Sequence, residues 1–177
     1  MTNIDPKRID TADLATCAPL LRAGENVLLS GTVYTARDAA HKKLVTLLSA
    51  GAPLPFDLNG ACVYYAGPTP TPPGLPIGSA GPTTSERMDS YTPQLLHAGV
   101  RGLVGKGPRA QSVRDALCET GSVYFCALGG AGALAARCIV SCAELAFPEL
   151  GCESIKRLVF RDFPVIVGCD SAGGTVF

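Results

Sequence analysis

Residues 25–50, ENVLLSGTVYTARDAAHKKLVTLLSA, decide the fold because two hydrophobic patterns follow each other there. Glu25–Tyr34 is rich in β-branched and apolar residues, which predicts a strand. Arg37–Ala50 follows as a predicted helix that ends at Gly51. The apolar residues of this helix recur at helical spacing, at Ala40, Leu44, Leu47 and Leu48. A strand that runs directly into a helix is the basic unit of an α/β architecture.

The same alternation continues along the rest of the chain. Further strands are predicted at Cys62–Tyr65, Val100–Val104, Val123–Leu128 and on both sides of Pro164 within Ile155–Asp170. Further helices are predicted from a cap at Thr83, Thr84 or Ser85 to Met88, from a cap at Thr92 towards Gly99, and over Ala110–Glu119. The pattern predicts a mixed α/β or an α+β fold in a single domain, residues 1–177, whose functional loops follow strands.

Two glycine-rich segments interrupt this pattern. Residues 67–82, GPTPTPPGLPIGSAGP, hold too many prolines and glycines for regular structure. Residues 129–132, GGAG, predict a tight turn, and residues 133–137 then begin a helix or an irregular stretch.

Composition and charge exclude several classes of partner. Hydrophobic residues make up 47% of the 177 residues and charged residues 17%, below the roughly 25% usual for soluble proteins. Such a chain can bury a core and is compatible with apolar surface that a partner covers. Lys plus Arg and Asp plus Glu both count 15, so no basic field exists to attract nucleic acid or an anionic membrane.

The N-terminal residues predict a cytoplasmic location. Residues 1–10 are polar and charged, without the apolar core of a secretion signal. Apolar runs elsewhere in the chain stay well below the roughly 20 residues of a membrane span.

The eight cysteines point to free thiols rather than to a metal site. Cys138 and Cys142 have a helical four-residue spacing, and the other six stand singly, without a CxxC pair. A site built from these two cysteines with Glu144 and Glu149 has irregular spacing. We therefore expect buried structural thiols, and no metal held by this chain alone.

Arg37 and His41 lie four residues apart at the start of a predicted helix, so both side chains project from one face. An arginine fork binds a carboxylate through two hydrogen bonds, and a neighbouring histidine can relay a proton. The pair is a candidate site for a carboxylic acid. The alternative is a solvated first turn in which Arg37 pairs with an Asp or Glu side chain.

Residues 81–89, GPTTSERMD, place three hydroxyl side chains in a row at a predicted helix start, where free backbone N–H groups bind anions readily. A capping box between Thr83 and Glu86 is the alternative, and it explains those two residues. It leaves Arg87 unexplained, because a cation in the first helical turn is mildly unfavourable.

Lys106 stands between two glycines directly after a predicted strand, where the backbone can approach a ligand closely. A turn with a solvated lysine is the alternative. Gly130–Ala135, GAGALA, fits the loose G-x-G-x-x-A pattern of dinucleotide-binding loops, but no strand-end acidic residue completes that unit. A nicotinamide-binding domain is thus a remote alternative.

Three of these stretches, TARDAAHKKL, GPTTSERMDSYTPQLL and VGKGP, in this order and at these separations, resemble one enzyme family. The family is the β subunit, or C-terminal domain, of class I fumarases and L(+)-tartrate dehydratases. The resemblance covers nearly the whole chain, since LPFDLNGACVYYAGP, GGAGALAA and ELGCESIKRLVFRDFPVIVGCDSAGG also look like that family.

The resemblance implies a swivelling β/β/α domain that shares its active site with an α subunit. That partner would hold a 4Fe-4S cluster on three cysteines, in a hetero-oligomer such as a dimer of heterodimers. His41 matches the histidine of the family's RDxxH motif, expected to be catalytic, and Thr83 matches the threonine proposed as the proton-abstracting base. The residues expected to bind the dicarboxylate are Arg37, Thr83, Thr84, Ser85, Glu86, Arg87 and Lys106.

The implied reaction is the reversible hydration of fumarate to (S)-malate. Removing water from a 2-hydroxy dicarboxylate needs a Lewis acid for the hydroxyl, cations for two carboxylates and a base at the neighbouring carbon. Arg37, Arg87 and Lys106 can supply the cations, and His41 is chemically a more ordinary base than Thr83. The alternatives are an L(+)-tartrate dehydratase β subunit and a non-catalytic binding or regulatory module. The chain alone is expected to be inactive.

Overall fold

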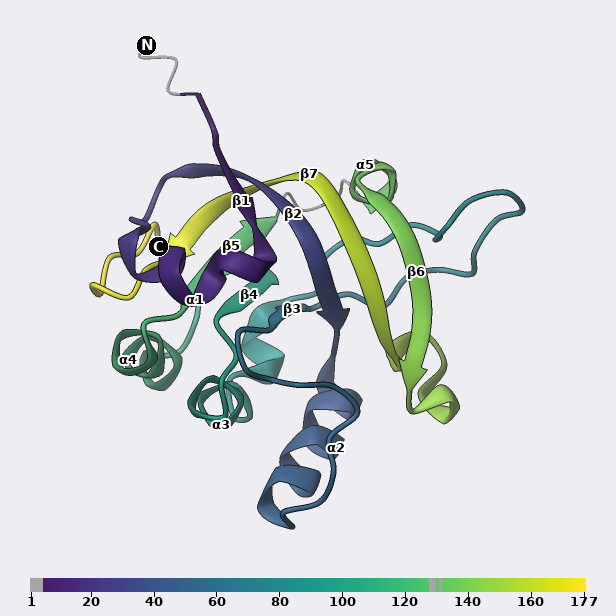
Figure 1. Cartoon of the computed structure of the whole chain (residues 1–177), viewed down its shortest axis with the longest axis horizontal. Helices are drawn as coiled ribbons and strands as arrows, with labels where there is room; N and C mark the ends of the chain where they lie inside the picture. The colour runs from purple at the N-terminus through teal and green to yellow at the C-terminus, as the bar shows by residue number, and fades with distance from the viewer. Residues whose placement is uncertain (1–4, 128–129, 131) are drawn as a thin grey trace.

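A single mixed sheet organises the molecule. The computed structural model describes residues 5–127, 130 and 132–177, and the seven strands among them join one sheet (Figure 1). Their bounds are β1 Lys7–Asp10, β2 Asn26–Thr35, β3 Cys62–Tyr64, β4 Gly102–Gly105, β5 Val123–Ala127, β6 Ile139–Ala146 and β7 Ile155–Cys169. Their order is β1-β2-β3-β4-β5-β7-β6, and a further pairing of β7 with β2 closes the sheet into a barrel-like ring.

The helices are short and lie mainly outside the ring. They are α1 Leu14–Cys17, α2 Asp38–Ser49, α3 Thr92–His97, α4 Gln111–Thr120 and α5 Gly132–Arg137. Four 3₁₀ turns join them: η1 Thr11–Asp13, η2 Ala18–Leu20, η3 Ser85–Met88 and η4 Pro148–Glu153. Among the described residues, none of these helices is long and apolar enough to cross a membrane.

Strands β2 to β5 are parallel neighbours in chain order, joined by connections that carry α2, α3 and α4. Parallel strands need such crossovers, and crossovers of one hand put their helices on one face of the sheet. Figure 1 shows α2, α3 and α4 together on that face. The mixed α/β class predicted from the sequence is therefore confirmed.

Two apolar cores explain why β3, β4 and β5 are apolar at every position. Tyr64 and Phe125 point into the ring, where they meet Phe160 of β7 and other buried side chains. Tyr65, after β3, and Tyr124 belong to a second buried cluster, shared with the outer helices. Because side chains alternate along a strand, a strand with both faces covered has no polar side.

β7 is the antiparallel element that closes the ring. Its first half pairs with β2 and β6, and its second half pairs with β2 and β5. The sequence predicted two runs around Pro164, whereas the structure has one strand of 15 residues. The strand has a bulge near Asp162, two residues before Pro164. Asp162 has φ 49°, and its backbone N–H donates to the Ser30 hydroxyl.

Several local predictions are wrong in detail. Thr92 lies inside α3 rather than capping it, and the capping box at Thr83 is absent because Thr84 precedes η3 and makes no side-chain cap. β1 and β6 have no counterpart among the predicted strands. Cys142 lies in β6, so its helical spacing from Cys138 is accidental. Parts of the predicted GGAG turn, the GAGALA loop and the end of the predicted Val123–Leu128 strand lie outside the described residues.

Candidate functional site

The three motifs singled out in the sequence follow three neighbouring parallel strands. Thr35 of β2 pairs with Tyr64 of β3, which pairs with Val104 of β4, so these strands end at one edge of the sheet. Arg37 follows β2, and Lys106 follows β4. The segment from Pro82 joins the same edge, since Pro82 forms a bridge with Ala66. Ligands of parallel sheets bind at such carboxyl edges.

Arg37 occupies the position just before α2 in an extended conformation. Its Nη2 atom lies 3.2 Å from Glu153 Oε1 and 3.7 Å from Asp38 Oδ2. Its Nε atom is buried and has no hydrogen-bond partner among the described residues. The carboxylate pairing matches the alternative expectation for this turn, and Nε is a buried donor that lacks a partner among the described residues.

Glu153 is a member of this site that sequence reasoning missed. Besides pairing with Arg37, it accepts a hydrogen bond from the backbone N–H of Ala39 at 3.2 Å. It thereby caps α2 from a segment 114 residues further along the chain. No local pattern signals such a contact, although the position of Glu153 just before β7 puts it at the same edge.

His41 is enclosed, with an exposed fraction of 0%. Its Nδ1 atom lies 3.0 Å from the carbonyl oxygen of Arg37, and its ring packs edge-on against Tyr65 at 5.3 Å. Burial lowers the pKa of His41 to about 4, so the ring is neutral at pH 7. Since the carbonyl requires a proton on Nδ1, Nε2 is an unprotonated acceptor, and it has no partner among the described residues.

The GPTTSER and GKG motifs touch each other directly. Thr84 and Lys106 form a parallel bridge, and the Ser85 N–H donates to the Lys106 carbonyl at 3.0 Å. In return the Lys106 N–H donates to Ser85 Oγ at 3.0 Å. A Cβ atom on Gly105 would lie 2.0 Å from Ser85 Oγ, which explains the glycine before Lys106.

The side chains of these motifs differ in exposure. Thr84, Glu86 and Arg87 are exposed, whereas Thr83 and Lys106 are half-buried. Ser85 is fully buried, and its oxygen already bonds to Lys106 and to the Tyr124 hydroxyl. Arg87 and Thr84 are thus exposed at this edge and Lys106 is partly exposed. Ser85 is buried below them and holds the Lys106 backbone.

A comparison with known proteins gives the family. The sequence model of the family described as "Fumarase C-terminus" matches residues 3–177. The chain belongs to the fumarase C-terminus family.

Relatives of this family member are enzymes of the same two kinds that the motifs indicate. The anaerobic class I fumarate hydratase of Escherichia coli strain K12 is 42% identical over 151 residues, 84% of this chain and 28% of that protein. Fumarate hydratase 2 of Leishmania major is 40% identical, over 87% of this chain and 28% of that protein. The chain therefore spans under a third of the length of these fumarate hydratases.

A third relative is close to this chain in length. A protein of Methanocaldococcus jannaschii, named for the β subunit of L(+)-tartrate dehydratase, is 36% identical over 163 residues. The match covers 89% of this chain and 84% of that protein.

The cysteines of this fumarase C-terminus chain do not fit a 4Fe-4S cluster. Cys62 and Cys169 are buried, and burial raises the pKa of both thiols. Cys118 and Cys152 are exposed, against the prediction of buried thiols. Within residues 5–127, 130 and 132–177, no three His, Cys, Asp or Glu side chains lie close enough together to hold a metal ion.

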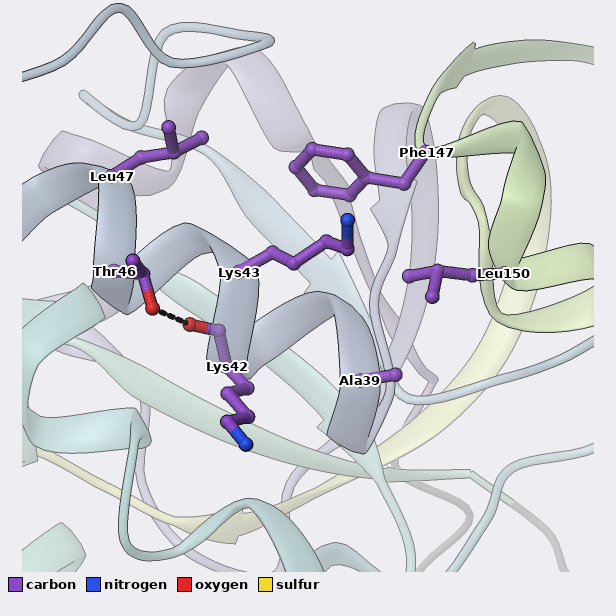
Figure 2. A pocket seen from close by; sticks show the side chains of 7 residues that line it. All are labelled: Ala39, Lys42, Lys43, Thr46, Leu47, Phe147 and Leu150. Carbon is purple, nitrogen blue, oxygen red and sulfur yellow. Dashed lines mark hydrogen bonds between the residues drawn. The ribbon is translucent and has the colours of Figure 1, made fainter.

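An apolar pocket of about 520 Å³ lies on the outer face of α2, between this helix and the η4 segment. In Figure 2 the Lys43 side chain extends towards the Phe147 ring, with Nζ 5.0 Å from the ring centre. Lys43 also pairs with Glu149 at 2.6 Å. Neither Arg37 nor His41 lines this pocket, so it is separate from the candidate site at the carboxyl ends of β2, β3 and β4.

Proposed function

We propose that this chain is the β subunit of a class I fumarate hydratase, which converts fumarate and (S)-malate into each other. The observation that carries the proposal is the meeting of the Arg37, Thr83–Arg87 and Lys106 motifs at one edge of three parallel strands. The fumarate hydratase relatives, up to 42% identical among those compared, support this reaction. The M. jannaschii relative supports the role of a separate β subunit.

The proposed task of this chain is to bind a four-carbon dicarboxylate. Arg37, Arg87 and Lys106 supply up to three positive charges for two carboxylates, and for the extra negative charge that develops when a proton leaves the carbon beside one of them. The ion pair with Glu153 fixes the Arg37 guanidinium, whose side chain is 20% exposed, beside this edge of the sheet. Thr84, Ser85 and Glu86 would contribute backbone and side-chain contacts around these charges.

Proton transfer at the substrate is assigned to Thr83 in this proposal. Thr83 is half-buried at the edge of the sheet, and its N–H bonds to the Tyr65 carbonyl at 2.7 Å, which fixes its backbone. His41, although the better base by its ordinary chemistry, is enclosed and holds the Arg37 carbonyl. Its proposed part in catalysis is to fix the helix start that carries Arg37.

The cluster belongs to the partner in this proposal. The α subunit would hold the 4Fe-4S group, because the described residues of this chain do not fit it. When bound, an iron ion with an open position would act as a Lewis acid for the leaving hydroxyl.

The test is turnover by the chain assembled with its α subunit. Wild-type complex should hydrate fumarate, whereas Arg37→Ala and Lys106→Ala should lower kcat/KM by about 100-fold or more, because each removes a charge that stabilises the transition state. The cluster absorption spectrum should be the same in all complexes. Lys42→Ala is the matched control, since Lys42 is an exposed lysine of α2 outside the site.

L(+)-tartrate dehydratase is the second candidate, favoured by the name and length of the M. jannaschii relative. Turnover of L(+)-tartrate but not fumarate would select it. Turnover of neither substrate would contradict both enzymes, and would leave the non-catalytic module as the better account.

A further inference from the structure

Arg109 is a buried arginine that the proposed reaction does not use. Its exposed fraction is 6%, and its guanidinium lies over the rings of Tyr65 and Tyr124, at 5.2 and 4.8 Å from their centres. Its Nε donates to Asp89 at 2.7 Å and its Nη2 donates to Thr92 at 2.9 Å. A buried charge with this many partners is held in one position.

The partners of Arg109 belong to the elements that carry the site. Asp89 follows η3, the turn after Thr83 and Thr84. One Asp89 oxygen accepts from Arg109, and the other accepts from the backbone N–H of Ala110 at 2.7 Å. The ion pair therefore ties the end of the loop from residue 105 to 110 to the GPTTSER segment.

The start of the same loop is fixed by a chain of hydroxyl groups. The Lys106 N–H donates to Ser85 Oγ, and Ser85 Oγ lies 2.9 Å from the Tyr124 hydroxyl. The Tyr124 hydroxyl donates to the carbonyl of Gly107 at 2.9 Å, so Ser85 must be the donor towards Tyr124. The chain begins and ends on neighbouring residues of the loop, and each member has its donors and acceptors satisfied.

Tyr124 contacts both the Arg109 ion pair and the chain of hydroxyl groups. Its hydroxyl fixes the backbone at Lys106 and Gly107, while the face of its ring lies against Arg109. Gly107, with φ 82°, allows the sharp turn between them.

We propose that Arg109, Asp89 and Tyr124 are positioning residues that hold Lys106 against the Thr83–Arg87 segment. This inference rests on the proposed function for its catalytic consequence, whereas its structural part concerns the loop itself. Lys106 has a long flexible side chain, so the direction of its ammonium depends on how firmly its backbone is fixed.

Amide hydrogen exchange on the full chain tests the structural part. Arg109→Lys keeps the charge but loses the planar fork, so exchange should become faster at the Lys106 and Ala110 amides. Tyr124→Phe removes one hydroxyl and should accelerate exchange at Lys106 while Ala110 stays protected by Asp89. The second variant keeps the test decisive if Arg109→Lys does not fold.

Arg101→Lys is the matched control. Arg101 is a partly buried arginine that bonds to the Leu96 and Val100 carbonyls at the opposite end of β4 from Lys106. This variant should leave exchange at Lys106 and Ala110 unchanged. Unchanged exchange at Lys106 in Tyr124→Phe would overturn the proposal.

Kinetics of the assembled enzyme test the catalytic part. Both variants should raise KM for (S)-malate and lower kcat/KM by about 100-fold, the cost of a misplacement of about 1 Å. Arg101→Lys should match the wild type. Faster exchange at Lys106 with wild-type KM would also overturn the proposal. Absence of turnover in the wild-type complex would instead contradict the proposed function, and the exchange experiment would still decide whether the loop is held as inferred.

Discussion

The two histidines of the chain lie in opposite surroundings. His41 is fully enclosed by α2 and two tyrosine rings, whereas His97 is exposed at the end of α3 and contacts Glu119 at 2.9 Å. Desolvation penalises the charged form of the first ring. The sequence shows both residues as helical histidines, and only the packing around them decides that one is buried and the other exposed.

We expect His41 to make the folded chain less stable as the pH falls from about 6.5 to about 4. Its pKa is lowered from 6.5 to about 4 on folding, so in this range the unfolded chain binds a proton that the folded chain does not. The loss should reach about 3 kcal/mol below pH 4. Urea unfolding of wild type and His41→Gln between pH 4 and 7 measures it.

His97→Gln is the control for this experiment, because His97 is exposed in the folded chain. His41→Gln should flatten the dependence of the unfolding free energy on pH that the wild type shows, and His97→Gln is measured beside it as a histidine replacement on the surface. An equal dependence in wild type and His41→Gln would show that His41 is not buried in the neutral form.

At the level of elements, α2 depends on a residue from outside its own sequence. The side chain of Arg37, the residue before α2, makes no cap hydrogen bond. Glu153 of η4 accepts the Ala39 N–H instead. The helix that carries Arg37 and His41 is therefore positioned by the segment before β7. This arrangement links Arg37 and His41 to the strand that closes the ring.

Glu153→Ala should lower the free energy of unfolding by about 1 kcal/mol, the typical cost of removing a helix cap. It should also free the Arg37 guanidinium from its main carboxylate partner. Glu149→Ala is a matched change in the same segment, and it removes only the exposed pair with Lys43. Chemical unfolding should show a clear loss for the first variant alone, and equal losses would contradict the capping role.

In the whole molecule, ring closure places the site. β7 pairs with both β2 and β5, and this closes the ring. The carboxyl ends of the parallel strands β2 to β5 therefore lie at one edge of the sheet. Arg37, Thr83 and Lys106 reach that edge from three separate connections. The molecule thus offers charged and hydroxyl groups on one edge, and the proposed partner would complete the site there.

The purified chain alone is expected to be colourless and inactive towards fumarate, (S)-malate and L(+)-tartrate. The reason is that its described residues do not form a cluster site, while the proposed reaction needs a Lewis acid from the α subunit. Visible absorption and iron content measure the first point, and steady-state assays with and without the α subunit measure the second. An iron-sulfur chromophore in the isolated chain would contradict the assignment of the cluster to the partner.

Much of the fold was predictable from local patterns. The strand and helix within residues 25–50, the helix from residue 110 and the irregular 67–82 loop were predicted within a few residues. β1 and β6 were not, because β1 is a short polar edge strand and β6 has mostly exposed side chains. Their pairing partners, rather than their own hydrophobicity, make them strands.

The sequence by itself determined that Arg37 and Lys106 each follow an apolar run, and that the GPTTSER segment comes after the irregular 67–82 loop. It also showed a glycine on each side of Lys106, but the reason for Gly105, the close approach of Ser85 Oγ, is a tertiary contact. Only the tertiary structure decided that Glu153 caps α2, that His41 is enclosed and that Arg109 and Asp89 form a buried pair. The physical reason is that burial and ion pairing depend on residues brought together by ring closure, whereas strand and helix patterns depend on neighbours along the chain.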